Sequence, residues 1–115
     1  MVRKFSDMKV ETREKMRGGE GAVDIRHYFS PEEFGARTRL CAKLTLPPGA
    51  SIGEHCHENE DEVYLILSGS GIVREQDGER AVSAGDAVLT GRGGSHAVFN
   101  NGAVPLEIAA IVILY

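Results

Sequence analysis

The stretch GASIGEHCHENEDEVYLILSG, residues 49–69, gathers two histidines and five acidic residues into positions 54–62 and then turns apolar. If residues 54–57 are extended, His55 and His57 leave the backbone on the same face, because side chains alternate along a strand. Residues 58–61, with the sequence ENED, form a polar turn of hairpin length. Glu62 then begins the returning strand. The pattern predicts a β-hairpin that places the Glu62 carboxylate beside the two imidazoles.

Short apolar runs separated by glycines continue on both sides of this hairpin. The segment TRLCAKLTL (38–46) alternates apolar and polar residues with a period of two, which is typical of a half-buried strand. Similar runs predict strands at 63–67, 86–90, 96–100 and 104–114. Asp77-Gly78 is a hairpin signal because both residue types tolerate positive φ, and Asn101-Gly102 marks another turn. Short strands at this spacing favour a barrel or sandwich over βαβ units.

The N-terminal region contains the only segments with helical character. SDMKVETREK (6–15) has a helix-like composition, and SPEEFGAR (30–37) offers Ser30 as an N-cap with Pro31 in the first turn. A chain of 115 residues predicts a single domain. We expect residues 1–22 to be an N-terminal extension and residues 23–115 to form the barrel.

Charge and hydropathy exclude several classes of partner. The net charge is -4 and the basic residues are scattered, which argues against nucleic acid and anionic membranes. The N-terminus lacks the apolar region of a signal peptide, and no apolar run approaches the roughly 20 residues of a membrane helix. We therefore expect a cytoplasmic protein in which Cys41 and Cys56 are free thiols. The run at 106–114 is apolar on both faces, which favours a homodimer that buries it.

His96 follows Glu62 by 34 residues, at the start of another predicted strand. An antiparallel barrel can bring that strand alongside the hairpin. Three imidazoles and one carboxylate would leave two positions open on an octahedral ion, which suits Mn, Fe, Ni or Zn in the divalent state. Such a centre keeps a net positive charge and attracts small anionic chelators, including diacids and hydroxy acids.

This spacing resembles the two motifs of the cupin superfamily. The matching patterns are Gly49-x5-His55-x-His57-x4-Glu62-x6-Gly69, over residues 49–69, and Gly85-x5-Gly91-x-Gly93-x2-His96-x3-Asn100, over residues 85–100. The resemblance, which is to small microbial single-domain cupins including oxalate-decarboxylase-like ones, implies a small antiparallel jelly-roll β-barrel. It also implies that one divalent metal is held by His55, His57, Glu62 and His96. Gly91 stands where the family has proline, which leaves the rigidity of the turn before His96 open.

Other residues near the motifs are secondary candidates. Rivals to Glu62 as the acidic ligand are Glu54, Glu58, Glu60 and Asp61. Alternation from Glu62 and His96 nominates Tyr64, Ile66, Val98 and Asn100 as pocket residues. Tyr64 could hydrogen-bond a substrate, and Asn100 more plausibly supports its turn. Arg17 and Arg92 could clamp a carboxylate, although a solvated role is favoured for both. His27 has no spacing partner and reads as a surface or packed imidazole.

The leading functional hypothesis is a metal-dependent enzyme of the decarboxylase or dioxygenase type, acting on a small organic acid or carbonyl compound. Proton transfer in such an enzyme would fall to Tyr64 or to a lid carboxylate such as Glu20. One alternative is a non-catalytic, metal-dependent protein that binds a small ligand. Another is a sugar isomerase or epimerase, which the scarcity of basic residues between positions 41 and 73 makes less convincing.

Overall fold

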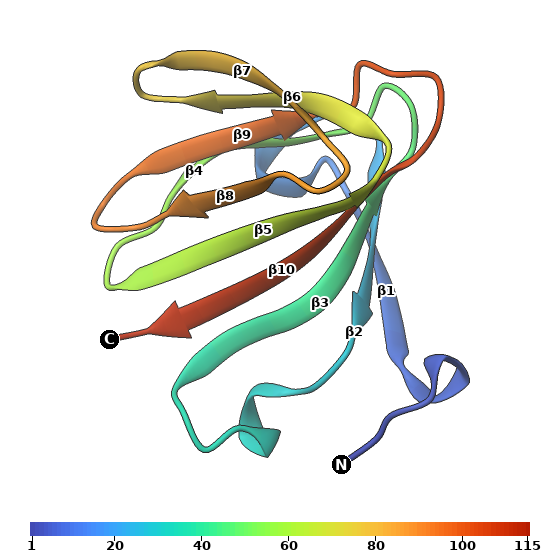
Figure 1. Cartoon of the computed structure of the whole chain (residues 1–115), viewed down its shortest axis with the longest axis vertical. Coiled ribbons are helices and arrows are strands. Elements are labelled where there is room, and N and C mark those ends of the chain that lie inside the picture. Colours follow the sequence, from blue (N-terminus) through green and yellow to red (C-terminus); the bar gives the residue numbers. More distant parts are fainter.

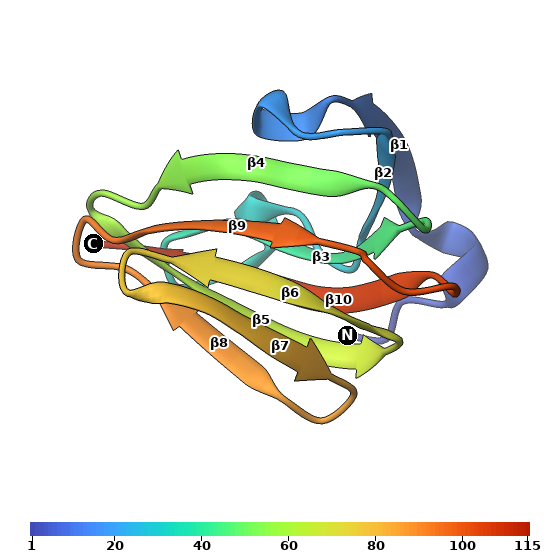
Figure 2. The same cartoon turned by 90° about the horizontal axis from the view of Figure 1, so that it is seen from above.

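The computed structural model describes residues 1–115, and its ten strands form two antiparallel sheets (Figure 1). The six-stranded sheet has the order β1 (Lys9–Glu14), β2 (Ala22–His27), β3 (Thr38–Leu46), β10 (Leu106–Leu114), β5 (Glu60–Ser68), β8 (Ala87–Thr90). The four-stranded sheet has the order β4 (Ser51–Cys56), β9 (Ser95–Phe99), β6 (Ser70–Glu75), β7 (Gly78–Ser83). Figure 2 shows the two sheets as facing layers. The expected all-β architecture is confirmed, but hydrogen bonds do not close the two sheets into one barrel.

The period-two pattern of the sequence produces the core between the sheets. Strand β3 has the bounds predicted from its alternation, and its residues Ala42, Leu44 and Leu46 are buried. Strand β10 runs through the middle of the large sheet between β3 and β5. Its inward residues Ile108 and Ala110 join the same apolar cluster, while alternate residues face outward. Burial of this inner face supplies the main favourable free energy of folding.

The helix-like segment at 6–15 is a strand in the structure. A single 3-10 turn, η1 (Phe5–Asp7), precedes β1, which pairs with β2 along its whole length. A helix of this length is marginal in water without an apolar face to bury, whereas pairing with β2 satisfies the backbone. The segment at 30–37 contributes only the 3-10 turn η3 (Pro31–Glu33), and the Ser30 side chain makes no capping hydrogen bond.

The hairpin expected at Asp77-Gly78 forms, but its loop lies one residue earlier. Gly78 already pairs with Glu75, so that Gln76 and Asp77 are the two loop residues. Gly78 has φ 130°, and it uses its conformational freedom as the first residue of the returning strand. No helix in the structure has the length and apolar character needed to cross a membrane.

The connection between β1 and β2, residues 15–21, crosses directly over β4, and we call it the strap. It contains the 3-10 turn η2 (Met16–Gly18). The Ser51 amide donates to the Glu20 carbonyl (2.8 Å), and the Glu20 amide donates to Ser51 Oγ (2.8 Å). A Cβ on Gly19 would collide with the Ser51 backbone, and one on Gly53 would collide with the Arg17 backbone. These two glycines therefore set how closely the strap approaches β4.

Candidate metal centre

Four side chains from both sheets converge at one end of the sandwich interior. His55 comes from β4, His57 from the loop after it, Glu62 from β5 and His96 from β9. His55 and His96 are direct cross-strand partners, which explains how a residue distant in sequence reaches the β4–β5 hairpin. The four donor atoms lie within 4.8 Å of one another. The structure thus brings together all four residues that the sequence nominates as ligands.

Each imidazole is held by a partner on its Nδ1 atom. His55 Nδ1 donates to the Gly53 carbonyl (2.8 Å), and His57 Nδ1 donates to Glu60 Oε2 (2.6 Å). His96 Nδ1 lies 2.8 Å from Thr90 Oγ1, which can accept its proton. This arrangement leaves all three Nε2 lone pairs directed at the centre of the cluster. Outer hydrogen bonds of this kind fix the tautomer and orientation of metal-binding histidines.

The spacing of the donor atoms fits a divalent ion with octahedral geometry. His96 Nε2 lies 3.1 Å from His57 Nε2, 3.1 Å from His55 Nε2 and 3.0 Å from Glu62 Oε1. Glu62 Oε1 is also 3.0 Å from His57 Nε2 and 3.9 Å from His55 Nε2. Bonds of about 2.1 Å place adjacent octahedral ligands about 3.0 Å apart, and tetrahedral ones about 3.4 Å apart. Four ligands leave two octahedral positions for an exogenous molecule.

The electrostatics of the cluster favour an ionised carboxylate. Burial acts to raise the pKa of Glu62, but its close contacts with the three imidazoles together hold that pKa well below its usual range. Burial lowers the pKa of His96 against the opposing effect of Glu62, whereas contact with Glu62 raises the pKa of His57. A metal ion requires an anionic carboxylate and neutral imidazoles, so its binding would displace any proton held at His57.

The other acidic residues of the hairpin take different positions. Glu60 lies behind His57 and forms a bidentate ion pair with Arg39, at 2.9 Å to Nε and 2.6 Å to Nη2. It therefore orients a ligand and does not join the cluster. Asp61 accepts a hydrogen bond from the Tyr115 hydroxyl (3.1 Å), while Glu54 and Glu58 are exposed.

The turn before His96 is tied to the hairpin by backbone hydrogen bonds, despite the glycine at position 91. The Gly93 amide donates to the His57 carbonyl (2.9 Å), and the His57 amide donates to the Gly94 carbonyl (2.9 Å). A Cβ at Gly91 would collide with the Asp61 carboxylate. The rigidity that proline would supply comes here from this reciprocal pairing. Cys56, beside it, is an exposed free thiol that donates to the Gly93 carbonyl.

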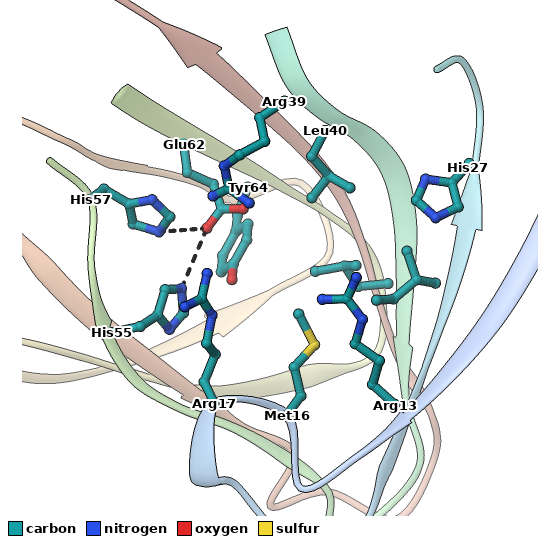
Figure 3. Close-up of a pocket in the computed structure, with 12 residues that line it drawn as sticks. Arg13, Met16, Arg17, His27, Arg39, Leu40, His55, His57, Glu62 and Tyr64 are labelled. Carbon is teal, nitrogen blue, oxygen red and sulfur yellow. Dashed lines mark ion pairs between the residues drawn. The ribbon is translucent and has the colours of Figure 1, made fainter. Parts of the chain in front are cut away.

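A cavity of about 230 Å³ opens from the cluster (Figure 3). It is walled by β1, β2, β3 and the strap, and three arginines line it: Arg13, Arg17 and Arg39. Arg39 is committed to Glu60, and Arg13 contacts Glu11 (2.9 Å). Arg17 makes no hydrogen bond through its side chain and no ion pair. Figure 3 shows its guanidinium beside His55, on the same side of the cavity as Glu62.

Of the sequence-predicted pocket residues, Tyr64 lines the cavity and the other three lie elsewhere. The Tyr64 ring stacks on His96, with centroids 4.9 Å apart, and burial raises its pKa well above the usual value. Ile66 and Val98 point inward as alternation predicts, but they lie behind the site in the apolar core. Asn100 holds a turn by donating to the carbonyls of Leu46 (2.8 Å) and Val104 (2.9 Å).

The structure adds one feature to the expectations for the other basic residues. Arg17 is exposed, in keeping with the solvated role favoured for it, but it also lines the cavity, whereas Arg92 is exposed and lies outside it. His27 is a half-buried residue of the cavity wall and lies outside the metal cluster, as expected. Arg13 and Arg39 belong to no recognisable sequence motif. The alternation of β3 could have indicated that Arg39 lines the cavity only once the neighbouring strands were known.

Comparisons with known proteins agree with this architecture. A family model described as "Cupin domain" matches residues 42–113. A Thermotoga maritima protein named "Oxalate-binding protein" is 40% identical over 114 residues, covering 99% of this chain and 94% of the relative. A crystal structure from the same organism, described as a "predicted oxalate decarboxylase", superposes with a TM-score of 0.95 at 40% identity and covers 100% of both chains.

A more distant relative extends the range of described activities. The "Tetracenomycin polyketide synthase protein TcmJ" of Streptomyces glaucescens is 30% identical over 83 residues, covering 72% of this chain and 56% of the relative. The family model spans more than half of the sequence, and the full-length Thermotoga relative shares the fold throughout. This chain belongs to the cupin family.

Proposed function

We propose that this protein binds a small organic acid of the oxalate type through a divalent metal and Arg17. The metal would be held by His55, His57, Glu62 and His96, and its two further positions would accept two oxygen atoms of the acid. The observation that carries the proposal is the unpaired Arg17 guanidinium at the rim of this cluster. A free cation beside a metal site favours a ligand with more negative charge than the metal alone can balance.

Two further features support an anionic ligand. Glu62 is the only carboxylate among the residues that line the cavity, against three arginines, of which Arg17 has no acidic partner. The name of the Thermotoga relative points to the same class of ligand.

Arg17→Gln is expected to weaken oxalate binding by about tenfold or more, because one charge-assisted contact to a carboxylate is lost. The measurement is calorimetric titration of oxalate into the Mn(II)-loaded protein. Arg92→Gln is the matched control, since Arg92 is exposed and lies outside the cavity. Equal affinities for oxalate in the Arg17→Gln variant and the wild type would contradict the proposal, as would an absence of binding to the loaded wild type.

A second candidate function is catalysis at the same centre, and the position of Tyr64 favours it. Tyr64 is the only hydroxyl-bearing residue that lines the cavity, whereas Glu20, the other proposed proton donor, lies outside it. Decarboxylation of oxalate to formate and carbon dioxide consumes one proton, which replaces the lost carboxyl group on carbon. In this candidate function the Tyr64 hydroxyl would supply that proton.

If the protein is such an enzyme, Tyr64→Phe should lower formate production by about 100-fold, the usual contribution of a positioned acid. The ring would remain stacked on His96, so metal content should not change. The measurement is formate release from oxalate by the Mn(II)-loaded wild type and variant, with and without oxygen. No formate from the wild type would exclude this candidate and leave the binding function in place.

We also propose that two copies of the chain associate through the outer face of the large sheet. Cross-strand pairing aligns an apolar row over four adjacent strands, formed by Cys41, Ile111, Val63 and Leu89. Leu89 is 66% exposed and Leu65, beside this row, is 41% exposed. A two-fold interface between identical patches would cover them. Light scattering should give twice the 12.4 kDa chain mass, and Leu89→Glu should give the monomer. A monomeric wild type would contradict this assembly.

A further inference from the structure

The cavity has basic residues at both ends, and only one end adjoins the metal cluster. Figure 3 shows Arg17 near His55 and Glu62, whereas Arg13 and His27 lie at the opposite end. The distal residues come from the paired strands β1 and β2, on the far side of the cavity from the β4–β5 hairpin. A ligand that only chelated the metal and contacted Arg17 would leave this distal end unused.

The wall between the two ends is apolar. Ile25 and Leu44 are buried there, each about 1% exposed, and Met16 and Leu40 are partly buried against the core cluster. Apolar side chains facing a cavity favour a ligand whose middle portion is hydrocarbon. Oxalate has no such portion, because its two carboxylates are joined directly.

The volume of the cavity also exceeds what a molecule of six non-hydrogen atoms requires. A cavity of about 150 Å³ accommodates benzene, which has six such atoms, as oxalate does. The 230 Å³ found here is about half as large again. By the same proportion it has room for about nine non-hydrogen atoms, close to the ten of a five-carbon oxo acid with two carboxylates.

The distal end keeps hydrogen-bond donors that Glu11 does not use. Glu11 contacts both residues there, at 2.9 Å to Arg13 Nη2 and 3.5 Å to His27 Nε2. The Arg13 side chain is 54% exposed, so this ion pair is weak and exchangeable. A guanidinium has five N–H donors, and Glu11 engages only one of the Arg13 nitrogens. Arg13 therefore retains donors for a carboxylate that enters along the apolar wall.

We infer that the ligand of this site is a longer, two-headed acid. A 2-oxo or 2-hydroxy carboxylate head would occupy the metal and Arg17, a short hydrocarbon chain would lie against Met16 and Leu40, and a second carboxylate would reach Arg13. The inference rests on the proposed function, because it uses the same metal and the same proximal arginine. It differs in assigning Arg13 as the residue that selects for the second carboxylate.

The test compares two acids with identical heads and chain lengths. 2-Oxoglutarate carries a second carboxylate, and 2-oxopentanoate has a methyl group in its place. Calorimetric titration of the Mn(II)-loaded protein should show 2-oxoglutarate binding about fivefold more tightly, which is the upper end of what one ion pair with an exposed side chain contributes. In Arg13→Gln the two affinities should converge to within about twofold. Arg80→Gln is the matched control, since Arg80 is also exposed and pairs with one acidic residue, Asp77.

Equal affinities of the two acids for the wild type would overturn the inference, and so would a preference that persists in Arg13→Gln. In either case the proposed function would survive if oxalate binding still depended on Arg17. If oxalate and both oxo acids all fail to bind the metal-loaded protein, the proposed function fails and the inference fails with it.

Discussion

Replacing His96 with alanine is expected to lower the affinity for divalent metal by about 100-fold or more. Complete sites with four ligands bind metal with about 10–16 kcal/mol, so that one ligand contributes a few kcal/mol. Of the four residues, His96 is the one whose replacement should have the largest effect, because its Nε2 atom lies close to the donor atoms of the other three. The variant also removes the ring on which Tyr64 stacks. Metal content of untagged protein, measured by elemental analysis after dialysis, provides the first measurement.

Thermal unfolding provides a second and independent measurement of the same loss. A metal that binds only the folded state raises its stability, so Mn(II) should raise the melting temperature of the wild type. Mn(II) should leave the melting temperature of the His96→Ala variant nearly unchanged. His27→Ala is the matched control, because His27 is the one histidine outside the cluster. If His96→Ala keeps one tightly bound metal per chain, these four side chains are not the metal site.

The candidate ligands could be predicted from sequence because three of them belong to one hairpin. His55, His57 and Glu62 are arranged by local rules, namely alternation along a strand and a short return turn. His96 could be added only by assuming an antiparallel barrel, since its approach depends on β9 pairing with β4. The residues of the cavity wall could not be predicted by such local rules. Arg13, Arg39 and His27 reach it from three different strands, and their meeting depends on the order of the sheet.

The strand β1 shows why composition misled at the N-terminus. Residues 9–14 contain strong helix formers and bury almost nothing, so neither a helical nor a strand pattern is marked. Pairing with β2 decides their conformation, and that pairing is a tertiary contact. The same strand carries Arg13, so the error about local structure also concealed a residue of the cavity wall.

Gly19→Ala is expected to destabilise the fold by about 1–3 kcal/mol and to weaken oxalate binding by about tenfold. Gly19 has φ -75°, so alanine causes no backbone strain there. The Cβ would instead collide with the Ser51 carbonyl, and the strap must lift from β4. Since the strap carries Arg17, its displacement should reproduce the binding loss of Arg17→Gln. The metal ligands lie outside the strap, so Mn(II) affinity should be unchanged.

Gly35→Ala provides the control, because nothing lies near the position of its Cβ and its φ is not positive. Chemical denaturation and oxalate calorimetry on both variants separate the two effects. A Gly19→Ala protein that loses stability but binds oxalate normally would show that Arg17 reaches the ligand without the close crossing of strap and strand. A loss of both, with metal retained, would mean that the backbone contact between the strap and β4 is what positions the cation.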